Sequence, residues 1–382
     1  MHNGDGPTRV AHLSSAHHWS DTRIFGRLCR TLSRHGYDVT LVAAGDEGRR
    51  EEDGVHIVVE PIASGRAQRL LLAVPRVLAA AFRADADIYH LHDPELIPII
   101  PLLRLRGAQV VYDAHEDLPS QVLDKHYLPL GVRPVLAAVA RLLCAVADRS
   151  AHQIVAATPT IAERFRSERC TVVHNYPELL EDVDDTVDYD DRDPAIAYVG
   201  AVTAVRCATE MVDAMHLADL PEDWRLRLVG PASPANLRDE LATRPGWTLV
   251  EDHGNVSPRR ARELTASARI GLVLFQPTRA HVDALPTKLF EYMAAGLPIV
   301  ASDFPVWRTI IDGAGCGILV DPMDPSAIAK ALTTLARDPA GARAMGQNGR
   351  SAVLGHMNWA IEERNLLDAY TRLDARERTF SN

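Results

Sequence analysis

The segment Pro286–Ser302, PTKLFEYMAAGLPIVAS, joins a helix start to a buried strand within a short stretch of the chain. Pro286 and Thr287 suit the first turn of a helix, where free backbone N–H groups and the positive end of the helix dipole favour an anion. We expect Gly296 to end this helix. The following run Leu297–Ala301 has the apolar character of a strand that is buried on both faces. The segment therefore predicts one helix–strand unit of a parallel α/β sheet.

Two charged side chains make the same segment a candidate for binding a charged ligand. Lys288 lies in the first turn of the predicted helix, and Glu291 follows about one turn later, where it can accept hydrogen bonds from hydroxyl groups. Of the 41 basic residues only Lys125, Lys288 and Lys330 are lysine. A compact ammonium group approaches phosphate oxygens without the planar geometry of arginine, so the lysine indicates a phosphate contact. The alternative is a solvated helix face that carries a lysine by chance.

Short apolar strands alternate with helical stretches along the chain, which is typical of α/β folds with parallel sheets covered on both faces. At 382 residues the chain exceeds one hydrophobic core. The stretch Glu181–Asp193 holds eight acidic residues in thirteen, and we interpret it as an interdomain linker. We predict two Rossmann-like domains that face a cleft, with domain 1 at residues 1–180, a linker at 181–193 and domain 2 at 194–356.

The strands expected in this pattern fall into two series, one on each side of the linker. The first series is Arg9–Ser14, Asp38–Ala43, His56–Val59, Ile88–His92, Gln109–Tyr112 and Gln153–Ala156. The second series is Ala195–Val199, Arg225–Val229, Thr248–Glu251, Ile270–Phe275, Pro298–Ala301 and Gly317–Val320. A helix is expected at Thr22–His35, capped by Ser20 or Asp21 and ended by Gly36. A G-x-G-x-x-G motif follows none of these strands, which argues against a nicotinamide or flavin cofactor.

Composition excludes several classes of protein. The net charge of −10 comes without a basic stripe, so we expect no nucleic-acid partner. Five scattered cysteines without C-x-x-C spacing fit a reducing cytoplasm rather than a disulfide framework or a zinc ribbon. An uninterrupted apolar run of membrane-spanning length is missing, and the start of the chain does not read as a signal peptide. The apolar stretches Leu70–Phe82 and Val132–Ala147 leave open a peripheral contact at the inner membrane face, although core packing explains them too.

Histidine and acidic residues gather at two predicted strand ends in the first half. The sequences HLHDPE and YDAHED follow neighbouring strands, and they bring together His90, His92, His115, Glu116 and Asp117. The carboxyl ends of parallel strands are where α/β sheets bind ligands, so one interpretation is a substrate-binding wall with His115 near the reacting bond. A second is a metal site, because His-x-His places two imidazoles on one face of a strand.

A third interpretation of the same residues is structural. In it Asp93 caps a helix that Pro94 begins, Asp113 and Glu116 stabilise turns, and His90 is a core residue with its hydrogen bonds made. The three interpretations stay open at this point.

A second candidate site lies in the other half of the chain. The strand ending at Val199 runs into Gly200, followed by Thr203 and Arg206, a strand-to-helix turn that suits phosphate oxygens. Asp283 lies eight residues before Glu291, and the two acids bracket the turn with Thr287 and Lys288. Two acids around a phosphate would repel it unless one of them faces hydroxyl groups. A nucleotide sugar offers both kinds of group.

At this point the chain resembles the family 4 retaining glycosyltransferases, which have the GT-B fold. The resemblance covers nearly the whole length and rests on the following segments: HLSSAHHWSDTRIF, HLHDPEL, YDAHED, YVGAVTAVR and DALPTKLFEYMAAGLPIVAS. It differs from the common pattern by Asp283 in place of Glu, by Ala201 in place of Gly or Arg, and by Cys207 in place of Gly. It implies that the helix at 357–382 packs back on the first domain.

The resemblance also implies roles for individual residues. Glu291 would hold donor ribose hydroxyls as the second acid of a two-acid motif, with Asp283 as the first acid. Arg206, Lys288 and the backbone near Thr287 would lie at the diphosphate. His115 matches the histidine beside the transferred sugar.

We therefore predict a cytoplasmic retaining glycosyltransferase that moves a sugar from a nucleotide diphosphate to a glycan, lipid-linked or small-molecule acceptor. It would use no metal and no other cofactor, and phosphate charge in a front-face displacement would be stabilised electrostatically. The alternatives are a sugar-nucleotide-binding subunit without turnover, or a metal-dependent hydrolase that uses His and Asp. The catalytic assignments are His115, Arg206 and Lys288. The donor-binding residues are Gly200, Thr203, Asp283, Thr287 and Glu291, and the acceptor-binding residues are His18, Asp21, Arg23, His92 and Glu116.

Overall fold

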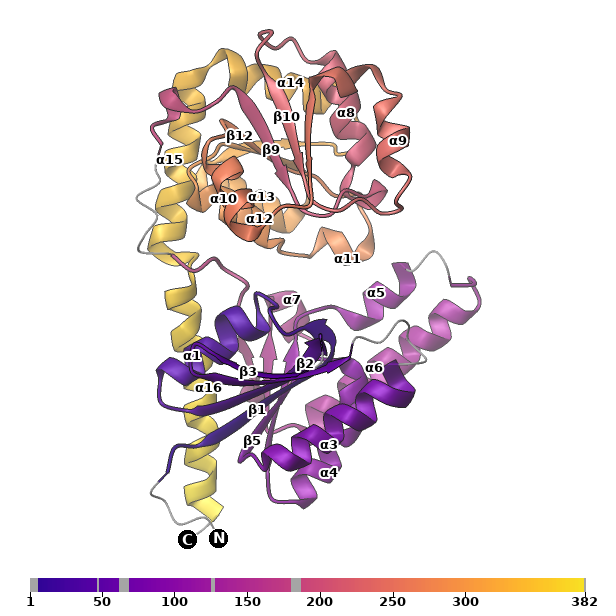
Figure 1. Ribbon diagram of the computed structural model, residues 1–382, viewed down its shortest axis with the longest axis vertical. Helices are drawn as coiled ribbons and strands as arrows, with labels where there is room; N and C mark the ends of the chain where they lie inside the picture. Colours follow the sequence, from indigo (N-terminus) through magenta and orange to yellow (C-terminus); the bar gives the residue numbers. More distant parts are fainter. Residues whose placement is uncertain (1–5, 47, 62–68, 125–127, 180–186, 381–382) are drawn as a thin grey trace. The chain divides into compact units, whose positions relative to one another are not determined.

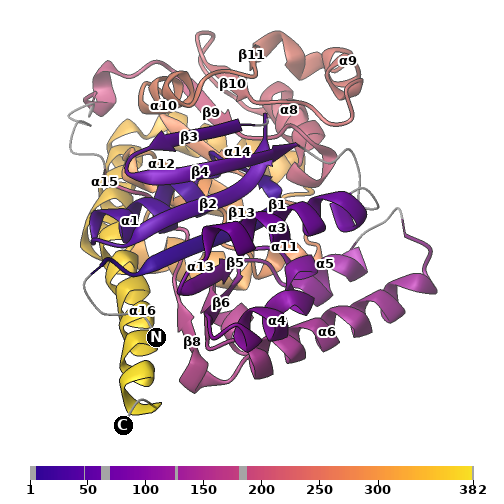
Figure 2. The same ribbon diagram turned by 60° about the horizontal axis from the view of Figure 1, so that its bottom comes forward.

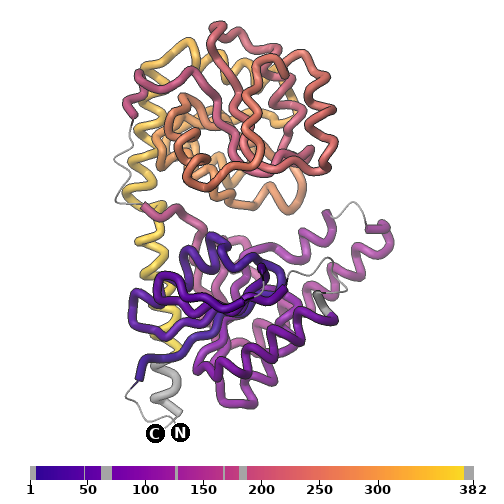
Figure 3. Tube along the Cα trace, in the orientation of Figure 1, coloured from indigo at the N-terminus to yellow at the C-terminus, as the bar shows by residue number. Residues whose placement is uncertain are grey.

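The computed structural model of the chain describes residues 6–46, 48–61, 69–124, 128–179 and 187–380. The chain forms two compact units, Met1–Asn175 with Trp359–Asn382 and Tyr176–Asn358. The trace in Figure 3 runs from indigo in unit 1 through unit 2 and returns to unit 1 with the yellow helix α16 (Trp359–Phe380). The observed division lies shortly before residue 180, where the sequence placed the end of the first domain.

A mainly parallel sheet forms the centre of unit 1. Within the described residues its eight strands follow the order β3-β4-β2-β1-β5-β6-β7-β8, and only β3 runs antiparallel to its neighbour. The strands are β1 (Arg9–His18), β2 (Asp38–Gly45), β3 (Gly48–Glu52), β4 (Val55–Pro61), β5 (Ile88–Leu91), β6 (Gln109–Ala114), β7 (Gln153–Ala156) and β8 (Cys170–Val172). Both edge strands, β3 and β8, were absent from the predicted series.

Helices cover both faces of this sheet, because successive strand residues point to opposite sides. Val10 packs with α16 and the segment around Leu28, whereas Ala11 packs on the opposite side with α3 and α6. Figure 2 shows α3, α4 and α6 on one side of the sheet and α1 and α16 on the other. The helices of unit 1 besides α16 are the π-helix η1 (Ile24–Cys29), α1 (Arg30–Arg34), the π-helix η2 (Arg69–Ala73), α3 (Val74–Ala84), the 3₁₀-helix η3 (Pro94–Ile99), α4 (Ile100–Leu105), α5 (Leu118–Asp124), α6 (Val132–Ser150), α7 (Pro159–Ala162) and the 3₁₀-helix η4 (Ser167–Arg169).

The C-terminal helix α16 is part of unit 1, as the resemblance implied. The indole N–H of Trp359 donates to the hydroxyl of Thr31 over 2.9 Å. Farther along the helix, the backbone oxygen of Leu373 accepts from the side-chain amide of Gln109 over 3.2 Å. These bonds are buried, so α16 completes one face of the first sheet.

Unit 2 is built around a parallel sheet of six strands in the described residues, in the order β11-β10-β9-β12-β13-β14 (Figure 1). These are β9 (Ala195–Val199), β10 (Arg225–Val229), β11 (Val250–Gly254), β12 (Ile270–Val273), β13 (Ile299–Ser302) and β14 (Gly317–Val320). The helices of this unit are η5 (Tyr189–Asp191), η6 (Ala204–Arg206), α8 (Ala208–Leu217), α9 (Leu237–Ala242), η7 (Pro245–Leu249), α10 (Pro258–Ala266), α11 (Arg279–Val282), α12 (Thr287–Ala294), α13 (Pro305–Ala314), α14 (Pro325–Arg337) and α15 (Pro339–His356). All four residues of β13 are buried, which confirms the predicted two-sided burial.

The predicted linker needs correction. Residues 181–186 lie outside the described part of the chain, but Tyr189 is buried in the core of unit 2. Arg192 donates to backbone oxygens of Ala268 and Ala295, and Asp190 pairs with Arg343. The second half of the acidic stretch is therefore folded against unit 2, because Asp190 forms an ion pair with Arg343 and the Tyr189 side chain packs in the core.

Among the residues that the structure describes, no helix is both long enough and apolar enough to cross a membrane.

Candidate active site

The turn that follows β9 brings two cationic side chains to one backbone position. Gly200 has a φ of +139°, and a Cβ there would lie 2.6 Å from Lys288 Nζ and 3.1 Å from Arg206 Nη1. A Cβ on Gly230, whose φ is +132°, would lie 2.1 Å from the backbone oxygen of Gly200. Only glycine fits at these two positions, and the space over Gly200 is bounded by an ammonium and a guanidinium.

Lys288 lies in the first turn of α12 and is only 8% exposed. Its Nζ lies 4.2 Å from the ring centroid of Tyr198 and 5.9 Å from that of Phe275, and has no hydrogen-bond partner among the described residues. Burial and then the charge of Arg206 lower the pKa of this ammonium to about 7, while Glu291 acts in the opposite direction. A buried, unpartnered cation is unfavourable in the empty protein, so this position is suited to an anionic ligand.

Arg206 is the last residue of the short helix η6 that follows Gly200, and Thr203 occupies its N-cap. The guanidinium carbon of Arg206 lies 5.3 Å from the ring centroid of Phe275. Thr203 Oγ1 is buried and lacks a hydrogen-bond partner in the described part of the chain. Cys207 has a left-handed backbone with a φ of 56°, which explains why the related pattern commonly has Gly at this position.

The predicted two-acid motif has different surroundings at its two ends. Glu291 is exposed on α12, one turn from Lys288, and its charge acts on that ammonium. Asp283 is exposed at the end of α11. Pro286 occupies the N-cap of α12, which therefore lacks a side-chain cap, and Thr287 is the first residue of the helix. The backbone N–H groups at this helix start stay available to a ligand.

In unit 1 the buried carboxylate of Asp113 joins the predicted residues. Arg23 donates to it from Nη2 over 2.7 Å and from Nε over 3.0 Å. The Nδ1 atoms of His92 and His115 lie 3.1 and 3.3 Å from Asp113 Oδ2. Burial alone would raise the pKa of Asp113, but the Arg23 charge and these bonds hold it well below its usual range. Asp113 thus fixes the orientation of both imidazoles.

His115 is the member of this group that a ligand can reach. Its side chain is 16% exposed, and Nδ1 faces Asp113 as an ion pair outside hydrogen-bond geometry, so Nε2 remains for a ligand. Burial would lower the pKa of His115, but Asp113 raises it overall. The ring of His17 lies edge-on at 5.1 Å between centroids.

His17 forms a second ion pair, with Asp93, over 3.0 Å. Burial would lower the pKa of His17, but the bond to Asp93 raises it to about 9. Asp93 also accepts from the hydroxyl of Ser14 over 2.8 Å and from the backbone N–H of Ser15 over 2.6 Å. Asp93 occupies the N-cap of η3, but its side chain makes no capping hydrogen bond, so the predicted capping role is wrong. The carboxylate instead accepts hydrogen bonds from Ser14 and Ser15 of β1.

Some of the predicted acceptor-binding residues are exposed, whereas others are buried. His18 is exposed and bonds Ser20 Oγ over 2.8 Å, and Glu116 is exposed after β6. Asp21 accepts from the backbone N–H groups of Arg23 and Ile24, both over 2.9 Å, so it caps the turn before η1.

Arg23 and His92 are buried and bonded internally, which corrects the expected direct contact with an acceptor. They can act on an acceptor only through Asp113, because their own polar atoms face the protein interior.

Two further residues of this region were not singled out from the sequence. His12 lies beside His92, with 2.9 Å between His12 Nδ1 and His92 Nε2, and the hydroxyl of Tyr370 lies 2.9 Å from His90 Nδ1. The pairing of β1 with β5 sets His12 opposite His90. The alternation of side chains along β1 predicts which face of the sheet carries His12. It does not predict that His90 lies opposite, because that depends on the order of the strands in the sheet.

Comparison with known families assigns both halves of the chain. Residues 22–176 match the family described as Glycosyltransferase Family 4, and residues 182–352 match the family described as Glycosyl transferases group 1. Each half of the chain thus matches a glycosyltransferase family model. The predicted α/β fold of the GT-B type is confirmed by the solved structures that the chain matches.

Curated relatives match this chain over part of their length. A D-inositol 3-phosphate glycosyltransferase of Xylanimonas cellulosilytica is 31% identical over 186 residues, which are 48% of this chain and 43% of the relative. The corresponding protein of Kineococcus radiotolerans is 29% identical over 46% of this chain and 44% of the relative. The alignments thus span less than half the length of these relatives.

Solved structures with the same fold match along nearly the whole chain. Sucrose-phosphate synthase from Thermosynechococcus elongatus has a TM-score of 0.76 at 18% identity, covering 97% of this chain and 100% of that one. Anabaena HepE, in complex with UDP and glucose, has a TM-score of 0.72 at 15% identity, covering 96% and 100%. At these identities the similarity establishes the fold.

Proposed function

We propose that this chain transfers a sugar from a nucleotide-diphosphate donor to an acceptor with retention of configuration. The observation that carries the proposal is the buried ammonium of Lys288, which lies without a hydrogen-bond partner in the described structure and approaches Gly200 together with Arg206. Two cations around one glycine and a free helix start suit the charge of a diphosphate. Glu291 is placed to accept hydrogen bonds from ribose hydroxyls.

The same residues support catalysis as well as binding. The bond between the sugar and the diphosphate breaks, and the new bond to the acceptor oxygen forms on the same face of the sugar. Negative charge grows on the departing phosphate, where Arg206, Lys288 and the N-terminus of α12 would stabilise it. The acceptor proton passes to that phosphate. His115, held by Asp113, is assigned to the sugar.

We choose UDP as the first nucleotide to test, since HepE has been solved with UDP, and we include an inositol phosphate among small acceptors because the curated relatives carry that name. Glycan and lipid-linked acceptors complete the panel. No metal or other cofactor is assigned to the transfer.

Binding of UDP should occur without divalent cations and should take up a proton. At pH 8 the free Lys288, with its pKa of about 7, is mostly neutral, and a bound diphosphate raises that pKa, so about 0.9 proton should enter per UDP bound. Isothermal titration of chelator-treated protein in two buffers of different ionisation enthalpy measures this uptake.

Two variants serve as controls for that titration. Lys288→Arg carries a permanent charge, so we expect it to bind UDP without proton uptake. Lys288→Met should bind UDP weakly and take up no proton. Unchanged uptake in both variants, or an absolute need for magnesium or manganese, would place the diphosphate site elsewhere.

The two alternative functions give different results with a nucleotide sugar. A transferase releases the nucleoside diphosphate in the presence of chelator when an acceptor is supplied. A binding subunit binds the donor without releasing it. A metal-dependent hydrolase that uses a histidine cluster loses activity when a chelator is added. The rings of His12, His90 and His92 are fully buried, however, and a substrate does not reach them.

We also propose that unit 1 contacts the inner membrane face peripherally and that the protein works in the cytoplasm. Helix α6 exposes Val135, Val139 and Leu142 at 63%, 47% and 64%, along one helical stripe, and Arg141 is exposed beside them. Apolar side chains next to arginine suit an anionic bilayer surface.

Cosedimentation with vesicles that contain anionic lipid tests the membrane contact. Val139→Asp with Leu142→Asp should abolish vesicle binding, whereas Leu354→Asp, at an exposed position of α15 in unit 2, should leave it unchanged. Equal binding by all three proteins would remove α6 from the interface.

A further inference from the structure

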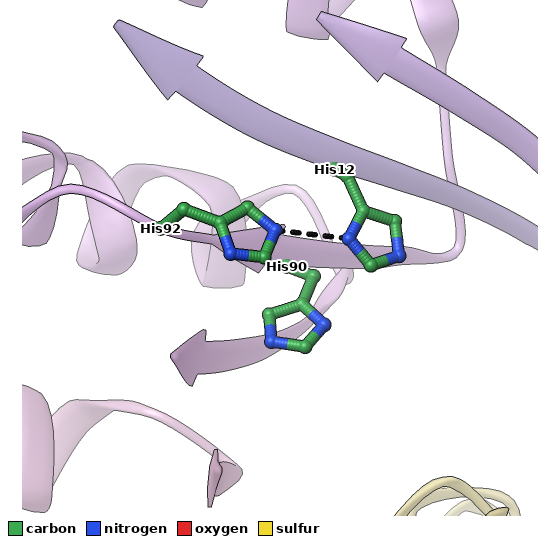
Figure 4. A group of neighbouring side chains, drawn as sticks. All are labelled: His12, His90 and His92. Atoms are coloured by element: carbon green, nitrogen blue, oxygen red, sulfur yellow. Dashed lines mark hydrogen bonds between the residues drawn. The ribbon is translucent and has the colours of Figure 1, made fainter. Parts of the chain in front are cut away.

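Three imidazoles lie together on the face of the unit 1 sheet that α16 covers. His12 is in β1, His90 is in β5 directly opposite it in the pairing of the two strands, and His92 follows two residues later. Figure 4 shows the three rings close to one another. All three residues have an exposure of 0%. A donor or acceptor does not contact these buried rings, and His92 alone is linked to the site proposed above, through Asp113.

The outer contacts of two rings resemble those of metal-binding histidines. His92 Nδ1 lies 3.1 Å from the Asp113 carboxylate, and His90 Nδ1 lies 2.9 Å from the Tyr370 hydroxyl. Metal-binding histidines commonly engage one ring nitrogen with a carboxylate or another oxygen, which fixes the ring and leaves the second nitrogen for the ion. Here Nε2 is the second nitrogen in both residues.

In the part of the chain that the structure describes, two of the other ring nitrogens lack the partners that buried polar atoms require, whereas His92 Nε2 lies 2.9 Å from His12 Nδ1. Among the described residues, His12 Nε2 and His90 Nε2 are buried without a hydrogen-bond partner. One nitrogen from each of the three rings can be chosen so that all lie within 4.8 Å of one another. Ligand atoms around a tetrahedral zinc ion lie about 3.4 Å apart. Ring rotations that move the nitrogens by roughly 1 Å would therefore bring them to the spacing of a zinc site.

We propose that His12, His90 and His92 bind one divalent cation of the zinc class inside unit 1. Imidazole nitrogens suit zinc, and three of them leave one position for a water molecule. The ion would tie β1 to β5 and, through Tyr370, to α16, so its role is to stabilise the fold. The proposal is independent of UDP binding, because the residues assigned to the diphosphate belong to unit 2.

Metal titration of the chelator-treated full chain tests the site. We expect one equivalent of Co²⁺ to bind with the visible absorption of a tetrahedral nitrogen site, and Zn²⁺ to displace it and raise the melting temperature. His12→Leu and His90→Leu should each weaken Co²⁺ binding at least about 100-fold, whereas His56→Ala, at an exposed position of β4, should not. UDP binding should be the same with and without metal.

A milder variant covers the case in which loss of a buried histidine prevents folding. Tyr370→Phe keeps the three ligands and the packing of α16 but removes the oxygen at His90, so Co²⁺ binding should weaken roughly 10-fold. The proposal is overturned if the wild-type protein gives no tetrahedral Co²⁺ spectrum, if Tyr370→Phe binds as wild type, or if the histidine variants bind equally well. Those results would leave a buried water as the partner of the free nitrogens.

Discussion

Replacing Arg206 by Ala should lower kcat/KM for sugar transfer by about 10²–10³-fold while the protein stays folded. The guanidinium stands beside Gly200 together with Lys288, where the departing diphosphate gains negative charge. Its loss leaves that charge to the Lys288 ammonium and the start of α12, so one of the two cationic side chains beside Gly200 is missing when the charge develops. Initial rates of nucleoside diphosphate release, measured over a range of donor concentrations, give the effect.

Two further variants separate a contact with the diphosphate from a general effect of positive charge in unit 2. Arg262→Ala removes an exposed arginine of α10 in the same unit and should leave kcat/KM unchanged. Lys288→Met should give a loss of the same order as Arg206→Ala. The role assigned to Arg206 is refuted if the folded variant keeps the wild-type kcat/KM, and a rise in KM with unchanged kcat would assign it to binding that is equal in the ground state and the transition state.

The sequence predicts those parts of the fold that local physics determines. Gly296, with a φ of +69°, ends α12 as expected, because glycine adopts this conformation without steric cost. The strand series was largely visible because buried parallel strands are apolar on both faces. The sequence of β3 is GRREE, so it lacks such a pattern; it forms by antiparallel pairing to β4 at the edge of the sheet. Pairing of that kind depends on the neighbouring strand.

The candidate site was predictable where the residues are adjacent in sequence. Thr287, Lys288 and Glu291 share one helix, and their common surroundings follow from its periodicity. The contacts of Asp93 and His12 depend on the order of β1, β5 and β6, which the chain sets over separations of about 80 residues. The interpretation of the acidic stretch as a linker was wrong for the same reason, since Arg343, the partner of Asp190, lies far along the chain.

Replacing Asp113 by Asn should destabilise unit 1 by about 3–5 kcal/mol, the second of the large effects. The Arg23 guanidinium is buried and stays charged, so in this variant it loses its counter-charge and keeps, among the described residues, the backbone oxygen of Val173, the side chain of Asn175 and at most one amide oxygen. His115 and His92 lose the negative charge beside their Nδ1 atoms in the same change, and an amide offers them and Arg23 a single acceptor oxygen. Chemical denaturation of the full chain, compared with wild type, measures the loss.

The reverse change should cost less, because the groups left behind differ. In Arg23→Met the Asp113 carboxylate keeps its two imidazole neighbours, and either can take up a proton to balance it, so we expect a smaller loss than for Asp113→Asn. The double variant should recover part of the Asp113→Asn loss, since no unpaired guanidinium remains. Glu263→Gln, which breaks exposed pairs with Arg259 and Arg260, should leave stability close to that of wild type. Equal losses for the two single variants would mean that the imidazoles do not compensate Asp113, and a loss for Asp113→Asn as small as that for Glu263→Gln would show that the buried pair does not hold unit 1 together.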